Sequence, residues 1–298
     1  MRKVVVLESV AAMRQWRRST QQRRVGLVPT MGALHEGHRQ LLEIARRDCD
    51  VLASSIFVNP TQFAPNEDLA KYPRTFEKDL EIMEEAGVDA LFFPSVDELY
   101  PGGGSRIFRV AAPDNFRNLA EAKARPGHFD GVATVCTKLF HIIEPQVAFF
   151  GQKDALQCVA LRNMVQDLNF DIQLRICPTA RAEDGLALSS RNAYLDPEAR
   201  RAAPVIYRAL RLARDFWALN IHVRPEKLVA IVRQVLDSEP RIDSIDYISI
   251  ADYDTMQEFE DETLPDYNAE QKHPVAILSV ALRLGGVRLI DNLPLSSS

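Results

Sequence analysis

The strongest candidates for chemistry are two histidines, His35 and His38, near the start of the chain. They are three residues apart, so a helical turn would place both on one face, where their ring N–H groups could donate to phosphate oxygens. Residues 29–38 follow an apolar run, and a turn from strand to helix leaves backbone N–H groups free to face an anion. Gly37 would let a flat ring approach the backbone closely. The alternatives are a surface pair or a metal pair, and without a third ligand nearby the His-x-x-His spacing is weak evidence for zinc.

A second polar group follows the apolar run at 147–150. Lys153 offers a point charge for a phosphate, and Asp154 could hold a ribose. Gln157 lies one helical turn after Lys153, on the same face. The group indicates a second contact with a nucleotide, and capping of the following helix is the alternative role for Asp154.

Two further polar stretches complete the set. Ser189, Ser190 and Arg191 follow one another, and an arginine can stabilise the charge that develops on a phosphoryl group during its transfer. Asn59 and Gln62 come after an apolar run and can bind a hydroxyl or a carboxylate oxygen without carrying a full charge. Taken alone, both stretches are also compatible with ordinary surface loops.

These polar stretches lie at the ends of predicted strands or at a predicted domain junction. Short apolar runs predict strands over 25–29, 51–58, 88–93, 147–150 and 172–177, and helical patterns predict helices over 38–48, 75–86, 129–143 and 154–168. This alternation predicts an α/β fold with a Rossmann-like parallel sheet and helices on both faces. Right-handed crossovers bring the carboxyl ends of parallel strands to one edge, where ligands bind. We therefore expect the polar stretches to meet at that edge.

The pattern changes after residue 180. Helices predicted over 197–217 and 225–236 precede extended runs over 245–250, 275–282 and 287–290. This order predicts a smaller α+β C-terminal domain over 181–298. Between its strands, residues 252–270 hold eight carboxylates and no lysine or arginine. We expect this acidic stretch to form a solvated loop or excursion.

Composition limits the possible classes of protein. The 298 residues are 46% hydrophobic and 26% charged, as in ordinary globular proteins, which argues against a disordered chain or a disulfide scaffold. The formal net charge is −5, yet residues 1–180 hold 22 basic and 22 acidic side chains. This balance argues against nucleic-acid partners but says little about a small anionic substrate. Four cysteines without a CxxC pair, no signal peptide and no membrane span predict a cytoplasmic protein with no membrane partner.

Taken in order, the polar stretches resemble one family over nearly the whole chain. The motifs are PTMGALHEGH, SIFVNPTQF, YPRT, RPGHFDGV, FFGQKD, LALSSRN and RLIDN. They closely resemble the pantothenate synthetases, or pantoate–β-alanine ligases, of the HIGH/KMSKS nucleotidylyltransferase superfamily. The stretch 35–38 looks like the HIGH element and 189–191 looks like the KMSKS loop. The resemblance implies a nucleotide- and pantoate-binding domain over 1–180 and a lid domain over 181–298 that carries the KMSKS-like loop.

The resemblance also implies a reaction. Pantoate would be activated by ATP to pantoyl adenylate and pyrophosphate, and β-alanine would then displace AMP to give pantothenate. Magnesium would accompany the ATP, and the protein would form a homodimer. The pantoate carboxylate attacks phosphorus directly, so no nucleophilic side chain is needed, and the protein's task is positioning and charge stabilisation.

Roles for single residues follow from the matched motifs. The residues implied to contact the ATP phosphates and stabilise the transition state are His35, His38, Lys153, Ser189, Ser190 and Arg191. Those implied to bind the rest of ATP are Met31, Gly37, Gly151 and Asp154. Pantoate would be bound by Gln62 and Gln157, and the β-alanine pocket would be lined by Asn59 and Tyr72. Asp79 would contact the magnesium ion through water.

Three other functions compete with this one. Another carboxylate-adenylating or nucleotidylyl-transferring enzyme of the superfamily would keep the histidines and Lys153 but change the acyl pocket, whereas Gln62 and Gln157 favour a small hydroxy acid. A relative that binds nucleic acid is disfavoured by the charge balance and the absence of an anticodon-binding module. A non-catalytic scaffold would not bind ATP. One departure from the family is the acidic stretch 252–270, because family members often continue from this point straight to their last strands.

Overall fold

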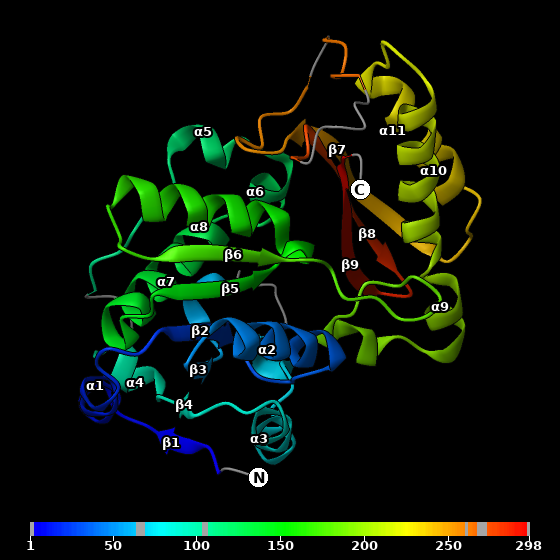
Figure 1. Ribbon diagram of the computed structural model, residues 1–298. Coiled ribbons are helices and arrows are strands. Elements are labelled where there is room, and N and C mark those ends of the chain that lie inside the picture. Colours follow the sequence, from blue (N-terminus) through cyan, green and yellow to red (C-terminus); the bar gives the residue numbers. More distant parts are fainter. Residues whose placement is uncertain (1–2, 64–68, 103–106, 260–261, 267–272, 297–298) are drawn as a thin grey trace. The chain divides into compact units, whose positions relative to one another are not determined.

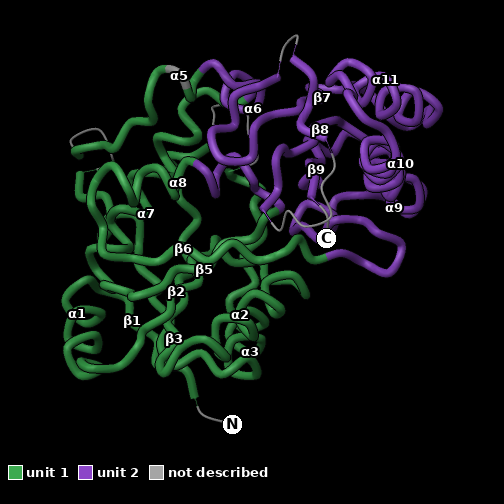
Figure 2. Tube along the Cα trace, turned by 45° about the horizontal axis from the view of Figure 1, so that its top comes forward, with its two compact units in different colours: residues 1–117, 125–152, 160–180 green, residues 118–124, 153–159, 181–298 purple. Residues whose placement is uncertain are grey.

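The computed structural model describes residues 3–63, 69–102, 107–259, 262–266 and 273–296 (Figure 1). Contacts within the chain divide it into two compact units, coloured separately in Figure 2. Unit 1 comprises residues 1–117, 125–152 and 160–180. Unit 2 comprises residues 118–124, 153–159 and 181–298. Two short segments of the first half therefore pack with the C-terminal part of the chain.

Unit 1 is built on a six-stranded parallel sheet (Figure 1). Its strands are β1 (Val5–Leu7), β2 (Val25–Thr30), β3 (Val51–Ile56), β4 (Ala90–Phe92), β5 (Val147–Gly151) and β6 (Gln173–Cys177). They lie in the order β1-β4-β3-β2-β5-β6, and every neighbouring pair is parallel. The predicted parallel sheet is confirmed. The sequence prediction missed β1, which has only three residues.

The central strands are buried on both faces. All six residues of β3 are buried, as is β2 except at Pro29, which explains their near-continuous apolar sequences. Two serines interrupt β3 at full burial, and the Ser54 hydroxyl is satisfied by donating to the Val28 carbonyl at 2.8 Å. A hydroxyl satisfied in this way can stand in a sheet core without an unpaired polar group.

The helices and short turns that precede residue 180 follow the strands closely. They are α1 (Val10–Ser19), α2 (Glu36–Asp48), η1 (Pro60–Gln62), η2 (Leu69–Lys71), α3 (Phe76–Glu85), α4 (Val96–Leu99), α5 (Asp114–Arg117), α6 (Ala120–Ala124), α7 (His128–Ile143), η3 (Gln152–Asp154) and α8 (Ala155–Asp167). Within unit 1, α2 packs with α3 and α1 packs with α7. Right-handed crossovers place these two pairs on opposite faces of the sheet.

The strand order reverses between β2 and β5. From β2 the chain moves to β3 and β4 on one side, and it returns to β5 and β6 on the other. In open α/β sheets, ligands bind beyond the carboxyl ends of the strands at such a switch point. Thr30 and Gly151 end the two strands that flank it, so the stretch after Thr30 is placed where a ligand is expected.

Unit 2 carries a three-stranded antiparallel sheet. Its strands are β7 (Ile242–Asp252), β8 (Ala276–Leu284) and β9 (Val287–Leu295), in that order. The later helices and the 3-10 turn before them are η4 (Ser190–Tyr194), α9 (Pro197–Ala202), α10 (Val205–Leu219) and α11 (Pro225–Leu236). Helices α10 and α11 pack together, and their apolar faces share one core with β8 and β9. The predicted smaller α+β domain is confirmed in its secondary-structure content.

One predicted helix was wrong in its continuity. The sequence predicted a single helix over 197–217, whereas α9 ends at Ala202 and α10 begins at Val205. Pro204 lies between them. Proline has no N–H to donate and its ring clashes with the carbonyl four residues earlier, so it ends the first helix and starts the second.

The acidic stretch 252–270 is attached to unit 2 where it is described, since residues 260–261 and 267–270 lie outside the described residues. Leu264 is buried in the core of unit 2, and its N–H donates to the Val223 carbonyl at 2.9 Å. The indole N–H of Trp217 donates to the Pro265 carbonyl at 3.0 Å. These contacts add apolar anchoring to what the sequence predicted as a solvated loop.

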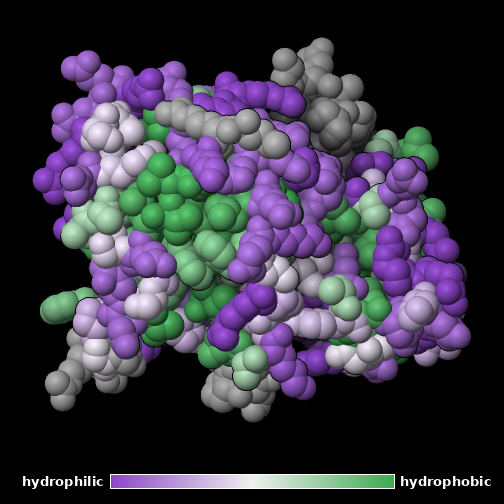
Figure 3. Space-filling model, turned by 90° about the horizontal axis from the view of Figure 1, so that it is seen from below, coloured by the Kyte–Doolittle hydropathy of each residue, from purple (hydrophilic) through white to green (hydrophobic). Residues whose placement is uncertain are grey.

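Some apolar side chains of unit 1 remain exposed. In Figure 3 they gather in one area of the face seen from below, the side on which β1 lies in Figure 1. The exposed large apolar residues of unit 1 include Val5 and Val6 of β1 and Val96 of α4. Strand β1 pairs only with β4 among the described strands, so it is an edge strand with an unpaired side. An apolar edge of this kind is typical of a surface that associates with another chain.

Candidate active site

The two histidines cap the first turn of α2. The His35 ring Nδ1 accepts the N–H of Gly37 at 3.1 Å, and the His38 ring Nδ1 accepts the N–H of His35 at 3.3 Å. Because both Nδ1 atoms are acceptors, we assign the ring protons to Nε2. The ring centroids are 4.1 Å apart. The pair is therefore prearranged with two Nε2–H donors, the groups that phosphate oxygens require.

Gly37 has no side chain because His35 occupies the space. A Cβ at this position would lie 2.9 Å from Cε1 of His35 and 3.3 Å from Cβ of Ala180. The approach of a ligand's flat ring to the backbone at Gly37 remains a prediction. The ring that lies against Gly37 in this structure is that of His35.

The backbone N–H groups before α2 are not free, contrary to the sequence expectation. Those of Ala33 and Leu34 donate to the two carboxylate oxygens of Asp79, each at 2.8 Å. The N–H of Gly32 donates to the Thr30 hydroxyl at 3.2 Å, and that of His35 to His38. The carboxylate of Asp79 thus occupies the N–H groups of Ala33 and Leu34 that a phosphate could have bound. The hydrogen-bond donors for a bound phosphate must therefore come from side chains.

Asn59 and Gln62 lie next to each other around η1, directly after β3. The Asn59 amide donates to Gln62 Oε1 at 3.0 Å and to the Gly131 carbonyl at 3.1 Å, and its Oδ1 accepts from the Tyr100 hydroxyl at 2.9 Å. Gln62 Nε2 contacts Sδ of Met31 at 3.1 Å. Met31, Asn59 and Gln62 therefore form one group. Asn59 is only 1% exposed and its amide donates to Gln62, so it is placed to hold the Gln62 side chain.

Three residues that support this group had no predicted role. Tyr100 donates to Asn59, and burial raises the pKa of its hydroxyl to about 12, so it remains a donor. His128 contacts the Gln62 carbonyl through Nδ1 at 2.8 Å and Arg125 through Nε2 at 2.8 Å. Arginine can only donate, so Nδ1 carries the proton. The signal for His128 was present in the RPGHFDGV motif; Tyr100 had no comparable signal.

Gly131 explains how α7 approaches η1. A Cβ there would overlap the Thr61 carbonyl and lie 2.7 Å from Cα of Gln62. Only glycine allows the helix backbone and the turn to come this close. Tyr72, the other residue predicted for the β-alanine pocket, directly follows η2 and is buried, with its ring 5.9 Å from that of Phe63.

The remaining predicted residues divide between the two units. Gly151 ends β5 in unit 1, and a Cβ there would meet open space. Lys153, Asp154 and Gln157 belong to unit 2, with the Lys153 ammonium 3.6 Å from the Asp154 carboxylate. The Ser189 hydroxyl caps η4, the turn that contains Ser190 and Arg191, by accepting the N–H of Arg191 at 3.3 Å.

Within unit 2, strand β9 connects these two groups. Asn292 of β9 donates to the Lys153 carbonyl at 2.8 Å, and β9 also packs against η4. Asp291 beside it forms a two-point pair with Arg181 at 2.6 and 2.8 Å. The closing RLIDN motif therefore has a structural explanation, since it anchors both Lys153 and the segment that leads to residues 189–191.

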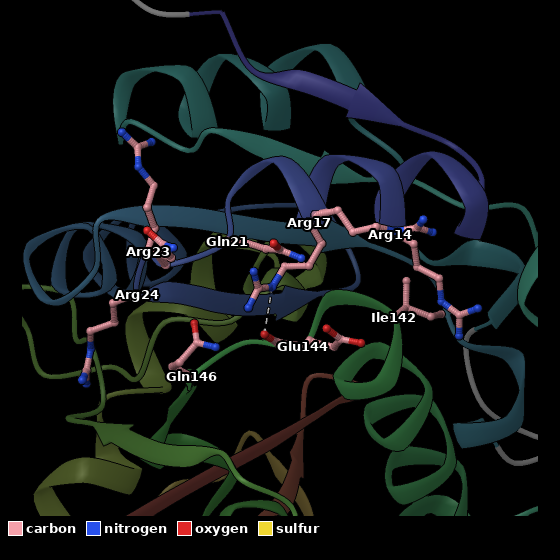
Figure 4. Close-up of a pocket in the computed structure, with 10 residues that line it drawn as sticks. Arg14, Arg17, Gln21, Arg23, Arg24, Ile142, Glu144 and Gln146 are labelled. Carbon is pink, nitrogen blue, oxygen red and sulfur yellow. Dashed lines mark hydrogen bonds between the residues drawn. The ribbon is translucent and has the colours of Figure 1, made fainter.

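A cavity elsewhere in unit 1 is a poorer candidate. It has a volume of about 610 Å³ and is lined by Arg14, Arg17, Arg18, Gln21, Gln22, Arg23, Arg24, Ile142, Glu144 and Gln146. Arg24 directly precedes β2 and Gln146 directly precedes β5, so the cavity lies at the amino ends of these strands. In Figure 4 Arg23 and Arg24 point away from each other, while Arg17 donates to the Glu144 carbonyl at 3.1 Å. These arginines do not converge on one point as a substrate site requires.

Comparison with known proteins agrees with the motifs. The sequence model of the family described as Pantoate-beta-alanine ligase matches residues 5–294. The chain belongs to this family. It is 50% identical over 288 residues to a pantothenate synthetase of Chloroflexus aurantiacus, covering 96% of each chain, and 44% identical over 296 residues to that of Moorella thermoacetica, covering 97% and 98%.

Solved structures of pantoate–β-alanine ligases are also similar. Pantothenate synthetase from Thermus thermophilus is 41% identical with a TM-score of 0.87, covering 98% of this chain and 100% of that one. The ligase from Francisella tularensis, complexed with βγ ATP and β-alanine, is 32% identical with a TM-score of 0.75, covering 98% and 97%. The fold class expected for a pantoate–β-alanine ligase is thereby confirmed over the whole described chain.

Proposed function

We propose that this chain is a pantoate–β-alanine ligase that condenses pantoate with β-alanine at the expense of ATP. The observation that carries the proposal is the family match over residues 5–294, because it includes both the histidine turn and the RLIDN strand. A related ligase has been solved in complex with βγ ATP and β-alanine. The products are pantothenate, AMP and pyrophosphate.

The first step forms pantoyl adenylate. The pantoate carboxylate attacks the α-phosphorus of ATP in line, and pyrophosphate leaves. His35 and His38 support this step by presenting Nε2–H donors at the switch point of the sheet. Lys153 adds a positive charge, and Ser189, Ser190 and Arg191 would bind the leaving pyrophosphate. Such groups stabilise charge as it develops without forming covalent bonds to the substrate.

The second step forms the amide. The amine of β-alanine attacks the acyl carbon of the adenylate, and AMP leaves with the electron pair of the broken C–O bond. Gln62 and Gln157 would bind pantoate, and Asn59 and Tyr72 would shape the β-alanine pocket. The buried hydrogen bonds of Asn59 favour an indirect contribution through Gln62. The other nucleotide contacts would come from Met31, Gly37, Gly151 and Asp154.

Magnesium is expected to arrive bound to ATP and to neutralise phosphate charge. The described part of the chain has no group of three or more His, Cys, Asp or Glu side chains arranged to hold a metal. Asp79, the residue assigned to the metal, does not fit that role in this structure, because both of its oxygens accept backbone N–H groups and it is 1% exposed. No step of the reaction is assigned to it as a metal ligand.

Two properties of the whole protein belong to the same proposal. A homodimer is supported by the exposed apolar edge at β1. A cytoplasmic location is supported by four buried cysteines, none of which forms a disulfide. Separately, none of the described helices is long and apolar enough to span a bilayer.

The decisive experiment omits each substrate in turn. We expect pyrophosphate release to require pantoate and ATP but not β-alanine, and AMP release at steady state to require all three. His38→Ala and Lys153→Ala should each slow pyrophosphate release on the order of 100- to 1,000-fold, as loss of one charge-stabilising donor does. His222→Ala, which changes an exposed histidine of unit 2, is the control. Pyrophosphate release with other hydroxy acids but not with pantoate would instead identify a different adenylating enzyme.

A further inference from the structure

The residue that carries a further inference is Asp79 of α3. Its two carboxylate oxygens accept three hydrogen bonds: the N–H of Ala33 at 2.8 Å, the N–H of Leu34 at 2.8 Å and the Thr75 hydroxyl at 3.0 Å. A carboxylate that is buried to this extent persists only when donors surround it. Here the donors are mainly the backbone of the turn between β2 and α2.

That turn has an unusual backbone. Gly32 has φ = +83° and Ala33 has φ = +54°. Glycine adopts this region freely, but alanine does so at a cost because its Cβ crowds the following carbonyl. Strained positions persist where the surroundings hold them. The two hydrogen bonds from Ala33 and Leu34 to one carboxylate supply that restraint.

The restraint reaches the histidines within one residue. Leu34 immediately precedes His35, which caps α2 and whose own N–H donates to Nδ1 of His38. A change in the direction of the Leu34 peptide would therefore move the His35 backbone and break the reciprocal capping of both rings. The orientations and the Nε2–H tautomers of the His35 and His38 rings therefore depend on the hydrogen bond between Leu34 and Asp79.

We propose that Asp79 is a positioning residue that holds the β2–α2 turn so that His35 and His38 keep their Nε2–H donors aimed at the ATP phosphates, and that it is not a magnesium ligand. The proposal rests on the proposed adenylation reaction. A carboxylate in this place serves the turn as an internal anion. The phosphate of ATP then interacts with side-chain donors and does not compete for the backbone N–H groups of Ala33 and Leu34.

The test compares Asp79→Asn with Glu81→Gln. Glu81 lies on the same helix and is exposed. The N–H groups of Ala33 and Leu34 donate to Asp79 and not to Glu81, so the control makes the same chemical change without removing a hydrogen bond of the turn. Asparagine keeps the size of the side chain, but its NH2 group faces one of the two N–H donors. We expect Asp79→Asn to lower kcat for pantoate-dependent pyrophosphate release on the order of 100-fold, as a displaced catalytic group does. KM for pantoate and the magnesium concentration that gives half-maximal rate should stay unchanged.

Two outcomes would overturn the proposal. A wild-type rate in Asp79→Asn would show that the turn does not need the carboxylate. Recovery of the lost rate at high magnesium concentration would show that Asp79 binds the metal. If Asp79→Asn does not fold, Thr75→Val removes only the third hydrogen bond, and a several-fold loss in kcat is expected.

A readout independent of catalysis separates this proposal from the proposed function. Nitrogen-15 NMR of the histidine rings reports which ring nitrogen carries the proton. We expect His35 and His38 to be Nε2–H tautomers in the wild type and in Glu81→Gln, and to lose that uniform signature in Asp79→Asn. Unchanged ring signals in Asp79→Asn would contradict the positioning role even if the enzyme acted on another acid. If the ring signals change in Asp79→Asn as expected but the wild type does not release pyrophosphate with pantoate, only the proposed ligase reaction is contradicted.

Discussion

Arg181 and Asp291 form a deeply buried ion pair in unit 2. The Asp291 side chain is 3% exposed, the Arg181 side chain is 15% exposed, and the guanidinium also lies 3.9 Å from the ring centre of Tyr207. Burial raises the pKa of the Asp291 carboxyl, and the guanidinium opposes that rise. The pair anchors the start of the segment that leads to Ser189–Arg191.

Removing Arg181 should therefore destabilise the protein strongly. Arg181→Met leaves the carboxylate of Asp291 buried without its partner, which costs about 3–5 kcal/mol of unfolding free energy. Arg200→Met, which breaks the exposed pair with Asp184, should cost less than about 1 kcal/mol. Urea unfolding monitored by circular dichroism measures both values.

The loss of unfolding free energy in Arg181→Met should also depend on pH. Without Arg181 the folded-state pKa of Asp291 rises further above its unfolded value. Stability contributed by such a group is greatest in acid and is lost as the pH rises through the folded-state pKa. The difference in the free energy of unfolding between Arg181→Met and the wild type should therefore become smaller as the pH falls. A difference that stays constant with pH would contradict an uncompensated charge at Asp291.

At the scale of elements, the contact between α7 and η1 determines where Gln62 lies. Gly131 lets the helix backbone meet the turn directly, and the Gly131 carbonyl accepts from Asn59. The turn has only three residues, so it has no internal core of its own and takes its position from the helix. Any side chain at position 131 must displace the turn.

Gly131→Ala should thus raise KM for pantoate by about tenfold or more, because a shift of the order of 1 Å in a substrate-positioning group has effects of this size. Cys136→Ala changes a buried residue of the same helix, so it controls for general loosening of α7. Initial-rate kinetics at saturating ATP and β-alanine measure the effect. Equal KM values for the two variants would show that α7 does not position Gln62.

The same elements show what the sequence could and could not reveal. The apolar runs located β2, β3, β5 and β6 within a few residues, since buried parallel strands have few alternatives. Strand β1 was missed because three residues carry too weak a pattern. The break at Pro204 was missed because the apolar periodicity continues across it.

For the candidate site, the types and order of residues could be predicted but their partners could not. The His-x-x-His spacing indicated a shared face, and α2 confirms that both rings lie in one turn. The use of backbone N–H groups by Asp79 could not be predicted, because 46 positions separate it from Ala33. A contact over such a distance in sequence is decided by the packing of α3 against α2 and leaves no local pattern.

For the whole molecule, the exposed edge of the unit 1 sheet is the feature with the broadest consequence. Val5 is 48% exposed on a strand whose second side has no partner strand among the described residues. Covering such an edge with a second copy of the chain would bury apolar surface and satisfy the unpaired backbone groups. The net charge of −5 is small for a chain of this length and leaves association possible.

Sedimentation velocity tests this association. We expect the wild type to be a dimer and Val5→Lys to shift the equilibrium toward monomer, because a charge on the edge disfavours pairing. Leu212→Lys makes a similar change at an equally exposed apolar site in unit 2 and should leave the dimer intact. A monomeric wild type at all accessible concentrations would contradict the dimer.

The four cysteines have a practical consequence for following this enzyme at work. All are buried and none forms a disulfide, and burial raises the pKa of Cys136 to about 12 and that of Cys177 to about 11. The thiolate is the nucleophile that attacks thiol-directed dyes, so these buried side chains should stay unlabelled at neutral pH. A cysteine introduced at one exposed position in each unit would then accept a fluorophore without removal of any native thiol. Energy transfer between two such fluorophores would report the distance between the two units in single molecules, with and without the substrates.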